Sequence, residues 1–401
     1  MQLTDPKIKF KLKRKMKLNA NNIYKYAIIS AITIVTISIW FVISSSKIGL
    51  GNLSVIKYSD MILSIFSSEG KAIDNNVLLV NVCYDKELAP VYDKFEFPMG
   101  HTAITDRGKL NSLLENLRRH NNYKYILMDV FLTPDFKTSS DSALFRNIAA
   151  IQRIIIPKHQ DGPQIDSTII HKAAYADYST NFWVNDFEKY PLFVNNQMSI
   201  AAAMYAQNQN KELCWNPIFA KENGRLIYKS IIPKFHIRPS DDYDSSGNKI
   251  IYQLGEDLLS LANDPTAFKN LIQDKWIVIG DFSESDIHQT YNGNIAGPLI
   301  IFNTFLNLLQ GNHFVKWWYI AILFALFFLM CKSTVCNSNG LTVKNKFLSL
   351  LLSWISYSTI MTIVCLISYY CFSMVVDIFF ISTIFAFYKY IFNWLKSDKY
   401  V

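Results

Sequence analysis

Carboxylates and an imidazole stand at the ends of several apolar runs that have the length of β-strands. The residues that could carry chemistry there are Asp85, Asp129, His159 and Asp281, with Asp286 and His288 in the loop beyond Asp281. Ligands of an open parallel sheet bind outside the carboxyl ends of its strands, so we expect these side chains to meet at one rim. Carboxylate and imidazole groups are suited to a divalent cation or to a small polar ligand.

The loop after Asp281 contains a second pattern. Asp286, His288 and Thr290 alternate along the chain, and alternate residues of an extended segment point the same way. The same residue types also hold turns, because Asp and Thr side chains bond to nearby backbone N–H groups. Turn-holding is therefore the first interpretation of these residues, ligand binding the second and catalysis the third.

Arg107 stands at the start of a predicted helix. We expect its guanidinium to pair with Asp129, and clamping of an anion is the alternative. The candidate ligand-binding residues are thus Asp85, Arg107, Asp129, Asp281, Asp286, His288 and Thr290. The sequence contains no hydrolase elbow, phosphate loop or His-Glu-x-x-His motif, so we predict no catalytic residue, no metal site and no enzymatic activity. No cofactor can be identified.

Strand and helix patterns alternate in the segments that must position this rim. Predicted strands cover 76–83, 125–132, 153–157 and 276–280, and predicted helices cover 106–120, 141–150 and 297–310. Continuous apolar strands separated by helices indicate an α/β fold, a mainly parallel sheet flanked by helices in three layers. Residues 225–232 and 249–254 predict an antiparallel addition, and 55–67 predict an amphipathic helix.

Four further apolar stretches have the length of transmembrane helices. They are 26–46, 314–331, 347–369 and 373–394, with a tight turn between the last two. A cleaved signal peptide is the alternative for the first stretch. The last stretch contains Asp377, an intramembrane acid for which snorkelling or local hydration near the interface is the simplest explanation.

The net charge of +8 is concentrated beside these stretches. Residues 1–25 carry eight Lys or Arg against one acid, and 332–346 carry three with no acid. Such clusters mark the cytoplasmic side of a membrane. We therefore expect 1–25, 332–346 and the tail 395–401 to be cytoplasmic, and 47–313 to form one extracytoplasmic domain. Because the middle region itself is slightly acidic, we expect no nucleic-acid partner.

Several blocks of the middle region follow one another in a recognisable order. They are Tyr58-Ser59-Asp60 with Phe66, the run 78–83, Ile104-Thr105-Asp106-Arg107, the run 126–131 with Pro134 and Asp141, and finally 276–280 with Asp286–Thr290, Gly297 and Asn303. This series resembles the CHASE domain of type 2, an extracytoplasmic sensory domain of bacterial membrane receptors, over residues 55–315. The chain departs from the family pattern at Asn81 and Cys83, at Thr290-Tyr291 and at 185–189.

The resemblance implies a sensor in the bacterial inner membrane, with both termini cytoplasmic and the main domain periplasmic. Its expected partners are the lipid bilayer, an unidentified small molecule or envelope protein, and a second copy of the chain. Family members commonly continue into an output enzyme, whereas the cytoplasmic segments here are too short to fold as one. We therefore expect the signal to pass to a separate protein. The alternative is a non-sensing structural or accessory subunit of an inner-membrane complex, and a transporter is the third hypothesis.

Overall fold

The computed structural model describes residues 20–43, 54–58, 76–93, 95, 97–133, 135–180, 187–217, 219–237, 249–283, 285–336, 346–372 and 374–397. The chain forms two compact units. The helical unit consists of Met1–Ile39, Trp317–Ile363 and Ile378–Val401, and the sheet unit consists of Trp40–Lys316 and Val364–Asp377.

The sheet unit is built on a six-stranded parallel sheet in the order β15-β1-β16-β4-β5-β6. The strands are β1 (Val77–Asn81), β4 (Tyr125–Met128), β5 (Ile154–Lys158), β6 (Ala173–Tyr175), β15 (Ile251–Gln253) and β16 (Trp276–Gly280). Every residue of β1, β4 and β16 is buried, because helices cover both faces of these central strands. The predicted parallel sheet flanked by helices is confirmed.

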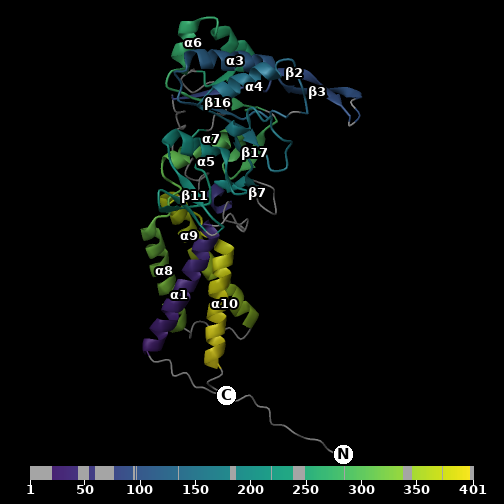
Figure 1. The fold of residues 1–401 in the computed structure, drawn as a ribbon. Coiled ribbons are helices and arrows are strands. Elements are labelled where there is room, and N and C mark those ends of the chain that lie inside the picture. Colours follow the sequence, from purple (N-terminus) through teal and green to yellow (C-terminus); the bar gives the residue numbers. More distant parts are fainter. Residues whose placement is uncertain are drawn as a thin grey trace, which may run out of the picture. The chain divides into compact units, whose positions relative to one another are not determined.

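One face of the sheet packs against α3 (Arg107–His120), α4 (Asp141–Ala150), a π-helical segment (Leu254–Leu259) and α6 (Pro265–Ile272). The opposite face packs against α5 (Ile200–Gln209) and α7 (Gly297–Leu309), so the sheet unit has three layers (Figure 1). The Trp276 ring of β16 meets Phe305 of α7 edge-on at 4.8 Å. The Tyr125 hydroxyl of β4 donates a hydrogen bond to Gln207 of α5.

Local sequence explains where α3 begins and ends. Asp106 accepts a hydrogen bond from the Lys109 backbone N–H at 2.9 Å, and Asn121 ends the helix in the left-handed conformation. Between these caps the four leucines of α3, spaced three and four apart, are at most 1% exposed. This amphipathic pattern is why the helix was predictable. At α4, Ser140 occupies the N-cap position without a side-chain capping bond.

The predicted antiparallel addition is confirmed only for its first segment, because 225–232 forms antiparallel strands but does not pair with 249–254. β15 pairs with β1 in parallel, with Leu79 opposite Ile251. The run 225–232 divides into β13 (Arg225–Ile227) and β14 (Ser230–Ile231), which pair with different strands. Short apolar runs identify strands, but they do not identify the partner strand.

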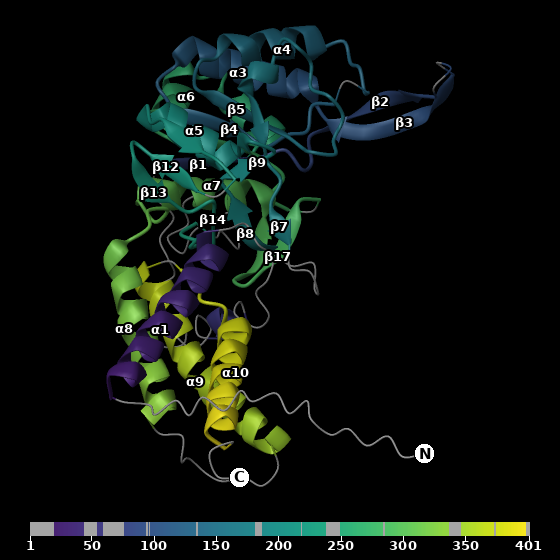
Figure 2. The ribbon, with the colours of Figure 1, turned by 60° about the horizontal axis from the view of Figure 1, so that its bottom comes forward.

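Smaller antiparallel pairs surround the main sheet. They are β2 (Lys86–Tyr92) with β3 (Pro98–Thr105), β7 (Ser179–Thr180) and β14 with β8 (Phe187–Pro191), β9 (Phe193–Val194) with β10 (Gln197–Met198), β11 (Leu213–Trp215) and β13 with β12 (Ala220–Glu222), and β17 (Ile287–Thr290) with β18 (Gly293–Ala296). The β2–β3 hairpin extends away from the layers of the sheet unit (Figure 2).

A buried polar cluster lies close to the end of the sheet unit's main segment. His313 Nε2 is 2.7 Å from Glu222 Oε2, and the Tyr205 hydroxyl donates to both Glu222 oxygens at 3.2 Å. The side chains of His313 and Glu222 are 1% and 3% exposed. Burial lowers the pKa of His313, although Glu222 acts in the opposite direction.

The helical unit contains the apolar helices α1 (Ala20–Ile43), α8 (Trp317–Cys336), α9 (Lys346–Phe372) and α10 (Ile378–Ser397), of which α1 and α9 run on into the sheet unit. Within the described residues, two helices, Trp317–Cys336 and Leu348–Phe372, are long and apolar enough to cross a membrane. The apolar parts of α1 and α10, Ile23–Ile39 and Ile378–Phe392, are shorter. Ring contacts join α8 and α9 to α10, since Phe385 lies 5.5 Å from Phe327 and 5.4 Å from Tyr357.

The boundaries of all four helices differ from the predicted stretches by a few residues, since α1 begins at Ala20, α8 ends at Cys336 and α10 ends at Ser397. The expected break between the third and fourth stretches is present, but α9 continues to Phe372 and α10 begins only at Ile378. Asp377 therefore precedes α10. Of the predicted helix 55–67, residues 54–58 are helical, and the remainder lies outside the described residues.

Candidate functional site

The sheet unit contains a cavity of about 710 Å³ at the carboxyl ends of β4, β5 and β16. This end of a parallel sheet is where ligands bind in open α/β folds. Five of the residues that the sequence placed at one rim line it together, namely Asp129, His159, Asp281, Asp286 and His288. Asp85, Arg107 and Thr290 do not line it.

Asp129 follows β4 directly, and its backbone N–H donates to the Ile279 carbonyl at 2.7 Å. Its carboxylate makes no hydrogen bond and no ion pair with the described residues, and the residue lines the cavity. Burial and the neighbouring Asp286 carboxylate raise the pKa of Asp129 to about 8. Asp129 therefore brings to the cavity a carboxyl group that the described residues do not satisfy.

Asp286, His288 and Tyr178 form a chain of hydrogen bonds along one wall. His288 Nε2 is 2.7 Å from Asp286 Oδ1, and His288 Nδ1 is 2.6 Å from the Tyr178 hydroxyl. Burial and the Asp286 carboxylate raise the pKa of Tyr178. The backbone of Gly297, at the start of α7, donates to the Asp286 carbonyl at 2.7 Å, and a Cβ at Gly297 would overlap the Asp286 carboxylate. Glycine is required there because the carboxylate lies against the helix.

Tyr190 of β8 brings a buried hydroxyl to the cavity. The side chain is 0% exposed, and the hydroxyl has no hydrogen-bond partner among the described residues. Burial, together with the carboxylates of Asp129 and Asp177, raises the pKa of Tyr190. A buried hydroxyl without a partner costs free energy, so a group supplied from the cavity would be favourable.

A more exposed pair stands at the cavity wall after β5 and β6. His159 Nδ1 lies 3.5 Å from Asp177 Oδ1, and the Gln160 backbone N–H donates to Asp177 Oδ2 at 3.1 Å. The His159 ring lies 5.7 Å from that of Phe131. The Asp177 carboxylate is thus engaged on both oxygens.

Three candidate residues hold turns or neighbouring segments. Asp281 lines the cavity, but its carboxylate accepts from the backbone N–H groups of Ser283 and Ser285 at 2.9 and 3.3 Å. Asp85 accepts from Lys109 Nζ at 2.6 Å and from the Gly255 N–H at 3.1 Å. The Asp281 contacts hold a local turn, as the first interpretation expects, whereas the Asp85 contacts join segments that are distant in the sequence.

Thr290 closes the turn between β17 and β18. Its hydroxyl donates to the Gly293 carbonyl at 2.8 Å and accepts from the Asn292 N–H at 3.0 Å. Although Thr290 alternates with Asp286 and His288 in the sequence, it does not share the cavity with them.

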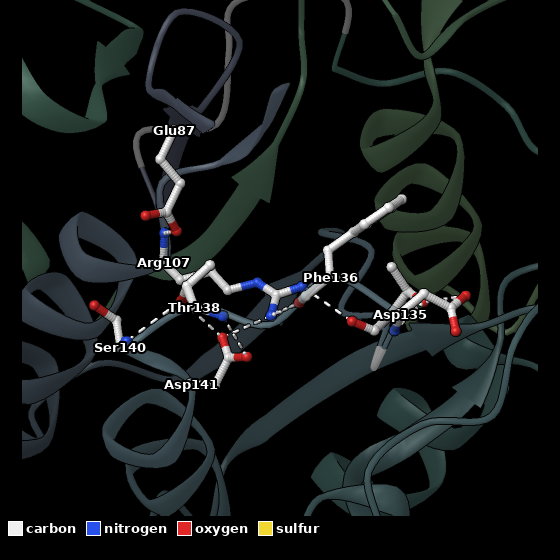
Figure 3. A network of polar contacts seen from close by, with 8 residues as sticks. Glu87, Arg107, Asp135, Phe136, Thr138, Ser140 and Asp141 are labelled. Carbon is white, nitrogen blue, oxygen red and sulfur yellow. Dashed lines mark hydrogen bonds and ion pairs between the residues drawn. The ribbon is translucent and has the colours of Figure 1, made fainter. Parts of the chain in front are cut away.

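The expected pairing of Arg107 with Asp129 is wrong, because the partner is Asp141. Arg107 Nη1 lies 2.6 Å from Asp141 Oδ1 and donates to the Phe136 carbonyl at 2.6 Å (Figure 3). Its Nη2 donates to the Thr133 carbonyl at 3.0 Å. Arg107 faces α4 and the loop before it, since it begins a helix on the α3–α4 side of the sheet. Thr133 and Phe136 line the cavity and Arg107 does not, so Arg107 supports part of the cavity wall through hydrogen bonds to the backbone of that wall.

Sequence reasoning did not find Tyr178 and Tyr190. Both lie in a stretch of short strands with neither helical nor strand periodicity, where tyrosines carry no positional signal. Among the residues that the structure describes, no three His, Cys, Asp or Glu side chains converge as metal ligands would. The cavity brings together instead a partnerless carboxylate, a partnerless hydroxyl and a Tyr–His–Asp chain, a set suited to hydrogen bonding with a polar ligand.

No protein-family model matches the chain, and no similarity to a curated protein or to a solved structure was found.

Proposed function

We propose that the chain is a membrane-anchored sensor, which binds a small molecule in the cavity of an extracytoplasmic sheet unit and signals to a separate output protein. The observation that carries the proposal is the combination of an open cavity of about 710 Å³ with the Asp129 carboxylate and the Tyr190 hydroxyl, neither of which has a partner among the described residues. Ligand pockets of this volume with a few convergent polar groups are typical of small-molecule sites.

The membrane part of the proposal is supported by the two long apolar helices and by the charge pattern of the sequence. In this arrangement α1, α8, α9 and α10 are the four spans, and both termini are cytoplasmic. The resemblance of residues 55–315 to type 2 CHASE domains adds the sensory role. The bacterial inner membrane is the corresponding location.

A chain of contacts offers a route from the cavity to α9. His288 lies on β17, and Tyr291 follows that strand in the same hairpin. The Tyr291 hydroxyl donates to the Pro233 carbonyl at 2.7 Å and lies 2.7 Å from the Tyr369 hydroxyl in the last turn of α9. All of these residues belong to the sheet unit. A ligand that favours one position of the β17–β18 hairpin would thereby favour one position of the end of α9.

The membrane arrangement is tested with reporters of compartment fused near Ser245 and after Val401. We expect the Ser245 reporter to be active only outside the cytoplasm and the Val401 reporter only inside it. If both report the same compartment, the sensor proposal fails.

Signalling is tested by crosslinking cysteine pairs placed on α9 and α10 of the full chain, with and without a compound that binds the cavity. We expect the crosslinking yield to change with ligand, and the change to be reduced in Tyr291→Phe, which keeps the ring but removes the bridging hydroxyl. Tyr84→Phe is the matched control, because Tyr84 is 67% exposed. An unchanged yield under ligand saturation counts against the sensor.

The rival function, a docking subunit of an inner-membrane complex, is favoured by the β2–β3 hairpin. The apolar side chains of Leu88 and Met99 are 71% and 70% exposed there, and Phe95 in the connecting turn is 67% exposed. Exposed apolar patches often mark protein interfaces. Co-purification of a partner that is lost on replacing Leu88 and Met99 by Ser, and that is indifferent to cavity ligands, would favour this rival.

A further inference from the structure

We propose that the ligand of the cavity is a small organic amine in its protonated form, bound through its ammonium group to Asp129 and Tyr190. This inference rests on the proposed function, because it names the ligand class of the same site. Two independent observations point to it. One is a carboxylate that faces the cavity without a partner among the described residues, and the other is a fully buried hydroxyl with the same property.

The charge of the lining selects a cation. Four carboxylates line the cavity, those of Asp129, Asp177, Asp281 and Asp286, against one ammonium group, Lys86, which is exposed on β2. Asp177 and Asp281 already accept hydrogen bonds from the backbone, and Asp286 accepts from His288 in a contact of 2.7 Å. An anion would meet these carboxylates in a partly desolvated space, where like charges repel strongly.

Among cations, the number of N–H donors favours an ammonium group. An ammonium group has three donors and no acceptor. One donor satisfies the Asp129 carboxylate, another meets a lone pair of the Tyr190 hydroxyl, and a third remains for Asp286 or water. The O–H of Tyr190 itself then donates to water or to an acceptor elsewhere on the ligand. A quaternary ammonium offers no N–H donor and would leave both groups unsatisfied.

The remaining walls suit an apolar body attached to the amine. Val130, Ile300 and Ile301 are at most 5% exposed and line the cavity together with Phe131 and Phe136. Aromatic rings additionally attract a cation that approaches their faces. The volume of about 710 Å³ exceeds what an ammonium group alone would fill. The expected ligand therefore has one charged end and an apolar or aromatic end.

Binding of such a ligand must compete with a proton. Burial beside Asp286 raises the pKa of Asp129 to about 8, so most Asp129 carboxyls in the empty cavity carry a proton at neutral pH. The titratable groups that line the cavity with Asp129 are Lys86, His159, Asp177, Tyr178, Tyr190, Asp281, Asp286 and His288. If Asp129 must ionise before the amine binds, affinity rises about fifty-fold between pH 6 and pH 8.

The experiment uses the full chain in nanodiscs and three probes that share one ring, benzylamine, benzyl alcohol and benzoate. Binding is followed by ligand-observed NMR and calorimetry at pH 6, 7 and 8, throughout which benzylamine stays protonated. We expect benzylamine to bind at least about tenfold more tightly than benzyl alcohol and benzoate to bind least. The affinity for benzylamine should rise with pH, and that for benzyl alcohol should not.

Three variants locate the site. Asp129→Asn should weaken benzylamine binding about ten- to hundred-fold and remove its pH dependence. Tyr190→Phe should weaken it about fivefold while leaving the unfolding temperature unchanged or higher, since the lost hydroxyl has no partner in the empty domain. Asp161→Asn, a change at an exposed acid outside the cavity, is the matched control and should leave binding unchanged.

Each contrary outcome is informative. Equal binding of the alcohol or of benzoate, no binding of benzylamine at millimolar concentration, or an affinity that survives both Asp129→Asn and Tyr190→Phe overturns the amine assignment. The sensor proposal fails separately, through the compartment reporters or through crosslinking that does not respond to a bound ligand. A neutral compound that binds the cavity and alters crosslinking would overturn the amine and leave the sensor standing.

Discussion

Replacement of Arg107 by Met tests whether the cavity wall depends on one buried ion pair. The Arg107 side chain is 2% exposed and that of Asp141 is 15% exposed. Removal of one partner of a buried pair costs about 3–5 kcal/mol, because the other charge is left without compensation. Asp141 would retain the N–H and hydroxyl of Thr138, both at 3.0 Å, and some contact with water. We therefore expect a loss at the lower end, about 3 kcal/mol in the free energy of unfolding.

Urea unfolding of the full chain in nanodiscs measures this loss, with amide hydrogen exchange of α3 and α4 as the local readout. Arg119→Met is the matched control on the same helix, because Arg119 and its partner Glu115 are 64% and 47% exposed. That change should cost no more than about 0.5 kcal/mol. The Thr133 and Phe136 carbonyls would also lose their donor, so amine or other ligand affinity should fall in Arg107→Met even where the domain remains folded.

A double variant supplies the refutation. Arg107→Met combined with Asp141→Leu removes both charges, and exchange of a buried pair for apolar side chains is often close to neutral. We expect the double variant to recover at least half of the stability lost in Arg107→Met. If it is less stable than the single variant, the carbonyl contacts rather than the ion pair hold the wall, and the electrostatic reasoning is wrong.

Three further outcomes are expected. The pKa of Asp129 is raised from 3.8 to about 8, so between those values the unfolded chain binds fewer protons than the folded chain. The contribution of this group to stability therefore falls as pH rises from about 4 to about 8. Urea unfolding across this range should show the fall in the native chain and not in Asp129→Asn. Gly297→Ala should cost about 1–3 kcal/mol by the same assay, since the new methyl group displaces the Asp286 carboxylate. The pKa of His313 is lowered from 6.5, so below that pH the unfolded chain takes up more protons than the folded chain. The sheet unit should therefore lose stability on acidification, as measured by the protection of β12 and β13 from hydrogen exchange. His313→Gln should remove this loss.

Each of these outcomes has a contrary result. A fall in stability from pH 4 to 8 that persists in Asp129→Asn assigns the titration to another carboxylate. Gly108→Ala is the comparison for Gly297→Ala, since a Cβ there meets the Asp106 and Ser140 side-chain oxygens at 3.3 Å, a tight contact that a shift of a few tenths of an ångström would relieve. Equal costs at the two glycines would show that crowding at Asp286 is unimportant. A protection factor of β12 that does not fall on acidification would contradict the neutral, buried state of His313.

The parallel sheet could be predicted because its central strands are apolar at consecutive positions, as in Trp276–Gly280. The rim could be predicted for the same reason, since parallel strands bring the residues after their carboxyl ends to one edge, and Asp129, Asp281 and Asp286 meet there. Which carboxylate is free could not be predicted. Asp281 and Asp129 follow strands in the same way, but only the loop after Asp281 supplies serine and backbone donors within hydrogen-bonding distance.

Partners across the fold could not be read from spacing either. Arg107 was expected to meet Asp129, and the direction of its side chain from the first turn of α3 carries it to Asp141 instead. β15 was expected beside 225–232 and pairs with β1, because a run of three residues does not specify its neighbour. Tyr190 lies on β8, which pairs with β14, and no sequence pattern predicts that these two strands pair.

In the proposed sensor, the contact between the Tyr291 and Tyr369 hydroxyls couples the cavity to the end of α9 in both directions. Coupling between two binding events is reciprocal. If a partner protein binds the end of α9 and prefers one of its positions, it changes the affinity of the cavity for its ligand by some factor. The ligand must then change the affinity for the partner by the same factor. Binding of such a partner would thus be detectable as a shift in the dissociation constant of an amine in the cavity, although the partner makes no contact with the amine. Tyr291→Phe, which leaves both binding surfaces intact, should bring that shift towards zero.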